Sequence, residues 1–191
     1  MSTSTTSARG AGAARLIAAG TCVRIVLAPL IMALVLAGDE ADVVAAILFV
    51  AVAATDWWDG WLARRWRITT TLGSFLDTTA DKLLVTGVLI ALVEAGRVST
   101  WIAAIIIGRE LVILALRGMV AVDGAVMPPS IWGKLKTAIQ FVAIPLAILR
   151  PGDPVGGLFL DEWVMLVAAA ITVMSAIEYL QRFSSALTGR D

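Results

Sequence analysis

Six long apolar stretches alternate with short polar breaks along the chain. A transmembrane helix needs about 20 predominantly apolar residues. The breaks carry Gly, Pro and charged residues, as turns between helices do. No internal repeat and no heptad seam is evident in the pattern. The stretches therefore predict an all-α integral membrane protein with six transmembrane helices, at residues 14–37, 42–66, 72–95, 99–121, 131–149 and 160–183.

Polar side chains within these stretches gather in alternate halves of successive helices. Thr21 and Arg24 lie in the first half of helix 14–37, whereas the polar residues of helix 42–66 lie in its second half. The same alternation continues to the last helix, so up-and-down threading brings every polar half to one side of the membrane. We therefore expect a polar cavity on that side.

The distribution of Lys and Arg indicates on which side of the membrane the polar cavity lies. All but two of the 15 Lys and Arg residues fall on the polar side, the exceptions being Arg97 and Arg150. Because cytoplasmic segments are enriched in Lys and Arg, the cavity is expected to open to the cytoplasm, with both termini there.

The amino-acid composition limits the class of protein and the chemistry that it can carry out. The chain of 191 residues is 59% hydrophobic and 16% charged, which excludes an ordinary soluble domain. We expect residues 1–13, rich in Ser, Thr, Ala and Gly, to be flexible, and residues 14–191 to form a single domain. A net charge of zero does not favour a nucleic-acid partner. The absence of histidine excludes imidazole metal sites and His-based catalysis, and the single cysteine excludes an internal disulfide.

Four aspartates stand at the edges of apolar runs. Asp56 and Asp59 are three residues apart and Asp77 and Asp81 are four apart, so each pair shares one face of a helix. A carboxylate at the centre of a bilayer costs about 2.5–3.5 kcal/mol. Divalent cations would compensate this cost, and oxygen-only ligands suit Mg²⁺ or Mn²⁺.

The same stretch fits the pattern D-x-x-D-G-x-x-A-R-x8-G-x-x-x-D-x-x-x-D. Its fixed positions are Asp56, Asp59, Gly60, Ala63, Arg64, Gly73, Asp77 and Asp81. In this the chain resembles the CDP-alcohol phosphotransferase family. The resemblance implies that the four aspartates bind two divalent cations, Mg²⁺ or Mn²⁺, and that Asp81 is the general base. It also implies a homodimer. Gly60, Ala63 and Gly73 would leave room for the nucleotide end of the donor beside Asp59, and Arg64 suits its phosphates.

Two further stretches concern the acceptor. GRELVILALRG contains Arg109 and Arg117, and WGKLKTAIQ contains Lys134 and Lys136. Both resemble the corresponding parts of bacterial phosphatidylglycerophosphate synthases, as does the T-x-x-R pattern of Thr21 and Arg24, which are candidate pocket residues. The Pro-Asn-x-Leu sequence usual in that group is absent, with LIAAG in its place.

This second resemblance implies a multi-pass enzyme of the inner (cytoplasmic) membrane of a bacterium, among membrane lipids. It would transfer a phosphatidyl group from CDP-diacylglycerol to glycerol 3-phosphate and release CMP. Glycerol 3-phosphate is a small dianion, so its pocket needs several cations, and we assign Arg109, Arg117, Lys134 and Lys136 to it. Arg109 lies in an apolar run and is expected to pair with Glu110 or with a carboxylate of another helix.

Other interpretations stay open. Within the family, phosphatidylglycerol (giving cardiolipin), inositol phosphate or serine are alternative acceptors. From other classes, an aspartate-rich membrane prenyltransferase or a cation transporter would also use carboxylates in a membrane. The aspartates could instead cap helices or pair with Arg64, Arg65 and Lys82. Lys134 and Lys136 could be surface side chains at a helix end, and Arg64 a surface anchor.

Overall fold

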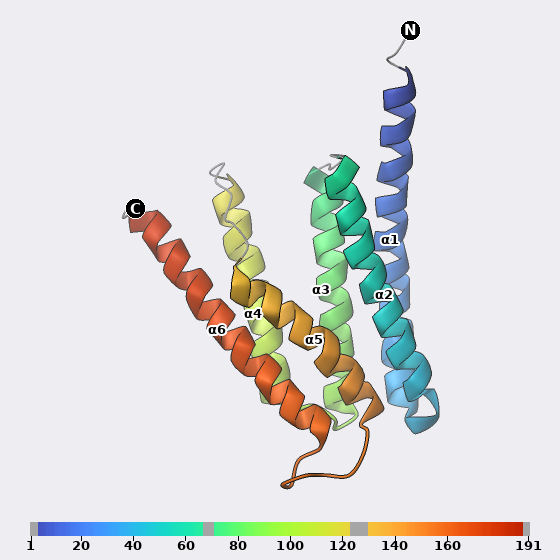
Figure 1. Cartoon of the computed structure of the whole chain (residues 1–191), viewed down its shortest axis with the longest axis vertical. Coiled ribbons are helices and arrows are strands. Elements are labelled where there is room, and N and C mark those ends of the chain that lie inside the picture. Colours follow the sequence, from blue (N-terminus) through green and yellow to red (C-terminus); the bar gives the residue numbers. More distant parts are fainter. Residues whose placement is uncertain (1–3, 67–70, 123–129, 189–191) are drawn as a thin grey trace. The chain divides into compact units, whose positions relative to one another are not determined.

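A computed structural model describes the backbone of residues 4–66, 71–122 and 130–188, and the side chains of residues 20–55, 79–120 and 130–184. The described residues form six α-helices and one isolated β-bridge, between Val155 and Leu158 (Figure 1). The helices are α1 (Ser4–Ala37), α2 (Asp39–Trp66), α3 (Thr71–Glu94), α4 (Thr100–Val122), α5 (Ile131–Leu149) and α6 (Leu160–Thr188). The predicted all-α class with six helices is confirmed. The main difference in bounds is that α1 begins at Ser4, ten residues before the expected start at residue 14.

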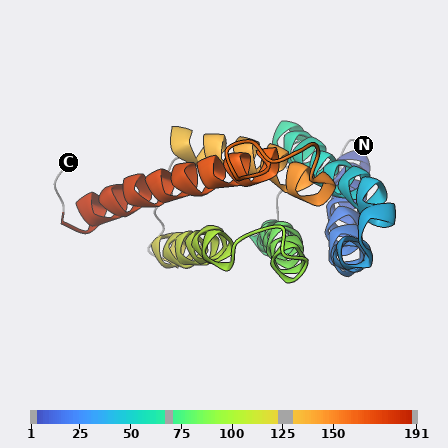
Figure 2. The ribbon, with the colours of Figure 1, turned by 90° about the horizontal axis from the view of Figure 1, so that it is seen from below.

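The chain divides into two compact units, and each is described by itself. In unit 1 (Met1–Ala91), α1 packs against α2 (Figure 2). The turn between these helices needs Gly38, whose φ of 91° is one that other residues rarely adopt. In unit 2 (Leu92–Asp191), α6 packs against both α4 and α5. The flexibility of residues 1–13 and the single domain at 14–191 stay predictions.

Buried positions recur at alternating spacings of three and four residues along the helices, which keeps them on one face. On α6 these positions are Asp161, Met165, Ala168, Thr172, Ser175 and Tyr179. On α1 they are Thr21, Arg24, Ala28, Ile31 and Val35. This burial is the one-sided packing of a helix against its neighbours, and the sequence does not show it as a pattern because the opposite faces are also apolar.

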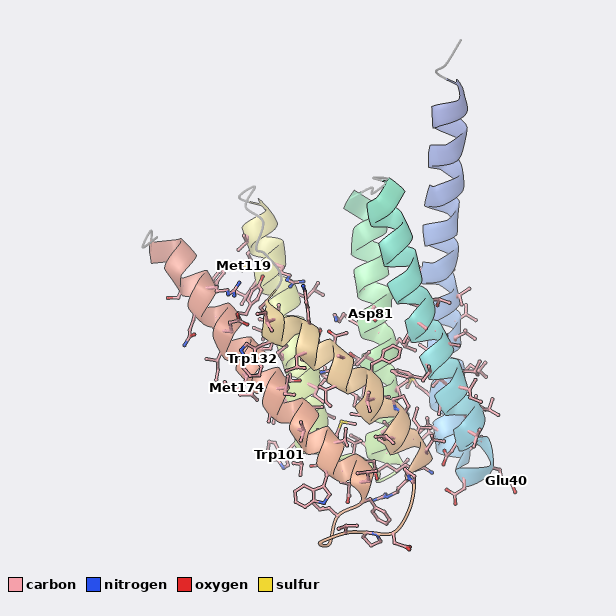
Figure 3. The ribbon with its side chains drawn as sticks, in the orientation of Figure 1. Glu40, Asp81, Trp101, Met119, Trp132 and Met174 are labelled. Carbon is pink, nitrogen blue, oxygen red and sulfur yellow. The ribbon has the colours of Figure 1, made fainter. Side chains whose placement is uncertain are left out.

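Large apolar side chains are exposed on these helices. Trp101, at the start of α4, is 80% exposed, and Met119, near its other end, is 61% exposed (Figure 3). Among the residues with described side chains, three helical runs are long and apolar enough to cross a membrane: Gly20–Ala37, Ile131–Leu149 and Leu160–Ser184. The chain is therefore a membrane protein, whereas the cytoplasmic cavity and the position of the termini stay predictions.

The two cations expected on the side away from the cavity meet at one end of unit 2. Arg97 donates a hydrogen bond to the carbonyl oxygen of Ile148, at the end of α5. Arg150 lies 3.2 Å from a carboxylate oxygen of Glu162 and 4.1 Å from the centre of the Phe159 ring. These contacts tie the turn before α4 to the connection between α5 and α6. The expected alternation of helix ends therefore holds within unit 2.

Close packing in unit 1 gives a test of the fold. A Cβ atom at Gly87 of α3 would lie 2.7 Å from Sδ of Met32 of α1, which is inside van der Waals contact. Alanine is favoured over glycine inside a helix by about 1 kcal/mol, and we expect Gly87→Ala to lose part or all of this gain because the Met32 side chain must move. Thermal unfolding in detergent measures the change. Gly118→Ala is the matched control, since a Cβ there meets nothing within 4 Å. A Gly87→Ala protein at least as stable as the control would contradict the close approach.

Candidate active site

The four aspartates of the signature lie on two helices that are consecutive in unit 1. Asp56 and Asp59 are in the second half of α2, ten and seven residues before its end. Asp77 and Asp81 are in the first half of α3, six and ten residues after its start. With a rise of about 1.5 Å per residue, Asp59 and Asp77 stand about 10 Å from their helix ends, and Asp56 and Asp81 about 15 Å. Each pair therefore lies at a similar distance from the end of its own helix.

Asp81 is the one member of the signature whose side chain lies in the described ranges. Its carboxylate is 33% exposed, and Oδ2 lies 3.3 Å from Nζ of Lys82. The predicted positions outside those ranges are Asp56, Asp59, Gly60, Ala63, Arg64, Gly73 and Asp77. In the part of the chain with described side chains, no three acidic or sulfur ligands come together, and this part holds one of the four aspartates. The four carboxylates suit a hard cation by their chemistry, and metal binding stays a prediction.

Thr21 and Arg24 lie one turn apart on the buried face of α1. They are 5% and 1% exposed, respectively. An arginine so deeply buried is placed for an interior role rather than for contact with lipid headgroups. Their assignment to a substrate pocket stays a prediction.

Three helices of unit 2 meet at a group of four side chains, Arg109, Glu110, Lys136 and Ser175, which we call the basic cluster. Nη1 of Arg109 lies 3.2 Å from Oε1 of Glu110, and Nζ of Lys136 donates to the same oxygen. Nη2 of Arg109 donates to Oγ of Ser175 at 2.7 Å. The cluster thus joins α4, α5 and α6 by charge-assisted hydrogen bonds.

The basic cluster is buried and carries an excess of positive charge. The side chains of Arg109, Glu110 and Lys136 are 8%, 4% and 5% exposed. Two cations face one carboxylate, so these three side chains sum to a charge of +1. Nε of Arg109 is buried and has no hydrogen-bond partner among the described residues. Such a site favours an anion, whose oxygen would satisfy the unused donor.

The cluster settles two interpretations made from the sequence. The pairing of Arg109 with Glu110 is confirmed. The alternative that Lys136 is a surface side chain at a helix end was wrong, because Lys136 is buried against Glu110.

The other two cations assigned to the acceptor lie differently. Arg117, two turns beyond Arg109 on α4, is exposed, and its guanidinium carbon lies 5.5 Å from the ring centre of the buried Tyr179. Such a contact restrains the arginine by a cation–π interaction. Lys134 is exposed, two residues before Lys136, so the two lysines point to different sides of α5. The structure therefore brings Arg109 and Lys136 together and leaves Lys134 on the surface.

The sequence analysis missed the contribution of α6. Ser175 contacts Arg109, Tyr179 contacts Arg117, and Thr172 accepts a hydrogen bond from Gln140 at 3.1 Å. A signal was available, because Thr172, Ser175 and Tyr179 are spaced by three and four residues along α6. Polar residues that share one face of a membrane helix usually turn toward other helices.

Comparisons with known proteins agree with the signature. The family model for CDP-alcohol phosphatidyltransferase matches residues 18–174. A Bacillus subtilis protein named CDP-diacylglycerol--glycerol-3-phosphate 3-phosphatidyltransferase is 38% identical over 182 residues, covering 87% of this chain and 94% of that protein. Proteins of the same name from Sodalis glossinidius and Yersinia pestis are 40% and 41% identical, each over 84% of this chain and 90% of their own length.

The sharing of one carboxylate by two cations predicts unequal effects of mutation. Glu110→Gln removes the carboxylate that both Arg109 and Lys136 contact, whereas Lys136→Met leaves the contact between Arg109 and Glu110 in place. Breaking a buried pair by removing one partner typically costs about 3–5 kcal/mol. We expect Glu110→Gln to reach that range and Lys136→Met to cost less, as measured by thermal unfolding in detergent. Equal losses, or a larger loss for Lys136→Met, would count against the sharing.

Proposed function

Because the chain belongs to the CDP-alcohol phosphatidyltransferase family, we propose that it transfers a phosphatidyl group from CDP-diacylglycerol to glycerol 3-phosphate and releases CMP. The relatives named for this reaction match most of the chain and are matched over most of their own length. The structural observation that carries the choice of acceptor is the buried basic cluster, with its excess positive charge and the unused Nε donor of Arg109. An acceptor without a net negative charge, such as serine, would not need these cations, and the choice of glycerol 3-phosphate over inositol phosphate follows the named relatives.

The donor is proposed to bind at the signature on α2 and α3. Asp56, Asp59, Asp77 and Asp81 would hold two divalent cations, Mg²⁺ or Mn²⁺, which when bound neutralise the pyrophosphate. Gly60, Ala63 and Gly73 would leave room for the nucleotide, and Arg64 would donate to its phosphates. The side chain of Asp81 is half-buried, at 33% exposure, and so is accessible to a substrate hydroxyl, which supports its role as the base.

The proposed reaction is one displacement at phosphorus. The hydroxyl oxygen of glycerol 3-phosphate forms a bond to the phosphorus that carries diacylglycerol. The bond from that phosphorus to the bridging oxygen breaks, and CMP leaves with the electron pair. Asp81 takes the proton of the attacking hydroxyl. Arg109 and Lys136 would bind the acceptor phosphate, with Arg117 and Lys134 as more exposed contributors. Thr21 and Arg24 of α1 are proposed as pocket residues from the family resemblance.

The proposal includes the location, membrane topology and oligomeric state of the enzyme. An excess of Lys and Arg on the polar side supports a multi-pass protein of the bacterial inner membrane with both termini in the cytoplasm. A homodimer is proposed from the family resemblance. CDP-diacylglycerol is itself a membrane lipid, so a site that opens at the membrane surface would suit both substrates.

The reaction is tested by CMP release from the purified protein with CDP-diacylglycerol and Mg²⁺, adding one acceptor at a time. We expect release with glycerol 3-phosphate and none with phosphatidylglycerol, inositol phosphate or serine. Release with one of those acceptors instead would overturn the acceptor and keep the family chemistry. Turnover of a prenyl pyrophosphate, without CMP release from any mixture, would overturn the reaction itself.

The role of Asp81 has a separate test. We expect Asp81→Asn to keep binding of CDP-diacylglycerol and to lower kcat at least about a hundredfold, because general-base catalysis contributes about 10²–10⁴. Equilibrium binding of radiolabelled donor and initial rates of CMP release measure the two effects. Asp153→Asn, the same substitution at an exposed acid between α5 and α6, is the control. Full activity of Asp81→Asn would remove the assignment.

A further inference from the structure

Arg109 is held from two helices at once. Nη1 contacts Glu110, its neighbour on α4, and Nη2 donates to Ser175 on α6. Ser175 is fully buried, and the Arg109 side chain is 8% exposed. A guanidinium is planar and its N–H groups lie in that plane, so directional hydrogen bonds at two of its nitrogens also orient the third. The two contacts therefore set where the unused Nε donor points.

Glu110 alone does not fix this orientation. Its Oε1 is shared between Arg109 and Lys136, and the contact with Arg109 is the longer of the two. A single contact at Nη1 leaves the guanidinium free to rotate about that point. The contact with Ser175, at 2.7 Å, removes this freedom, because it comes from a different helix.

We propose that Ser175 is a positioning residue that, together with Glu110, holds Arg109 in the orientation that binds the phosphate of the acceptor. This inference rests on the proposed function and deepens it. Ser175 acts through Arg109 and does not touch the substrate. Loss of the hydroxyl would leave the charge of the basic cluster unchanged and would loosen the guanidinium.

The chain offers a matched control for this role on the same helix. Thr172 lies one turn before Ser175, is also fully buried, and also joins α6 to another helix by a hydrogen bond, from Gln140. Thr172→Ala and Ser175→Ala therefore each remove one buried interhelical hydrogen bond. They differ in that the Ser175 contact involves Arg109.

The test compares the two variants in purified full-length protein with CDP-diacylglycerol and Mg²⁺. We expect Ser175→Ala to raise the KM for glycerol 3-phosphate about tenfold, with kcat and the KM for CDP-diacylglycerol nearly unchanged, since a hydrogen bond to a charged group is lost. Tenfold corresponds to about 1.4 kcal/mol. Thr172→Ala should leave the KM for glycerol 3-phosphate unchanged. Thermal unfolding in detergent should show similar midpoints for the two variants.

A double-mutant cycle shows whether Ser175 acts through Arg109. In an Arg109→Ala background, Ser175→Ala should add nothing to the KM for glycerol 3-phosphate. An equal rise in the KM in both backgrounds would overturn the positioning role. Provided that the wild-type protein uses glycerol 3-phosphate, two further results would overturn it. One is an equal rise in the KM for glycerol 3-phosphate in Ser175→Ala and Thr172→Ala, and the other is a rise in the KM for CDP-diacylglycerol alone in Ser175→Ala. A wild-type protein that releases CMP only with another acceptor would overturn this inference and the proposed acceptor together.

Discussion

The basic cluster depends on one carboxylate that neutralises charge where water is absent. Moving an ion from water to an apolar interior costs several kcal/mol even after the protein relaxes. Glu110 offsets that cost for Arg109 and Lys136 together, and Ser175 supplies a further oxygen from α6. One oxygen, Oε1 of Glu110, thus serves two cations from two helices, and the three helices of the cluster are joined through it and through Arg109.

The fold was largely predictable, because helix bounds depend on local signals. The ends of α2 to α5 came from Gly, Pro and charged breaks, and α5 begins and ends where expected. The packing faces were not predictable in the same way. In a soluble helix the polar face marks the outside, whereas here the exposed face carries residues such as Val167 and Ile177, as apolar as the buried Met165. Hydrophobicity alone therefore could not separate lipid-facing from protein-facing positions.

For the candidate site, the sequence predicted the residue types but few of their partners. Arg109 and Lys136 were assigned as cations for the acceptor, and the structure finds them side by side on α4 and α5. The two helices are separated by residues 123–130, and no local pattern links Arg109 to Ser175, 66 positions later. Such contacts follow from how helices pack, which a single sequence does not encode locally. The aspartates were recognised instead because their spacing is local to two consecutive helices.

The shared carboxylate also bears on how this chain enters the membrane. During synthesis α4 enters the membrane before α5, so Arg109 and Glu110 enter together and can neutralise each other. Lys136 arrives later on α5 with no acidic residue anywhere on its own helix. Lys136 is the sixth residue of α5, and a lysine that is not at the membrane surface is costly in lipid, so α5 would be stabilised by leaving the insertion machinery beside α4 rather than alone. Glu110, which joins α4 to α5 in the folded protein, would thereby also set the order in which these two helices are assembled.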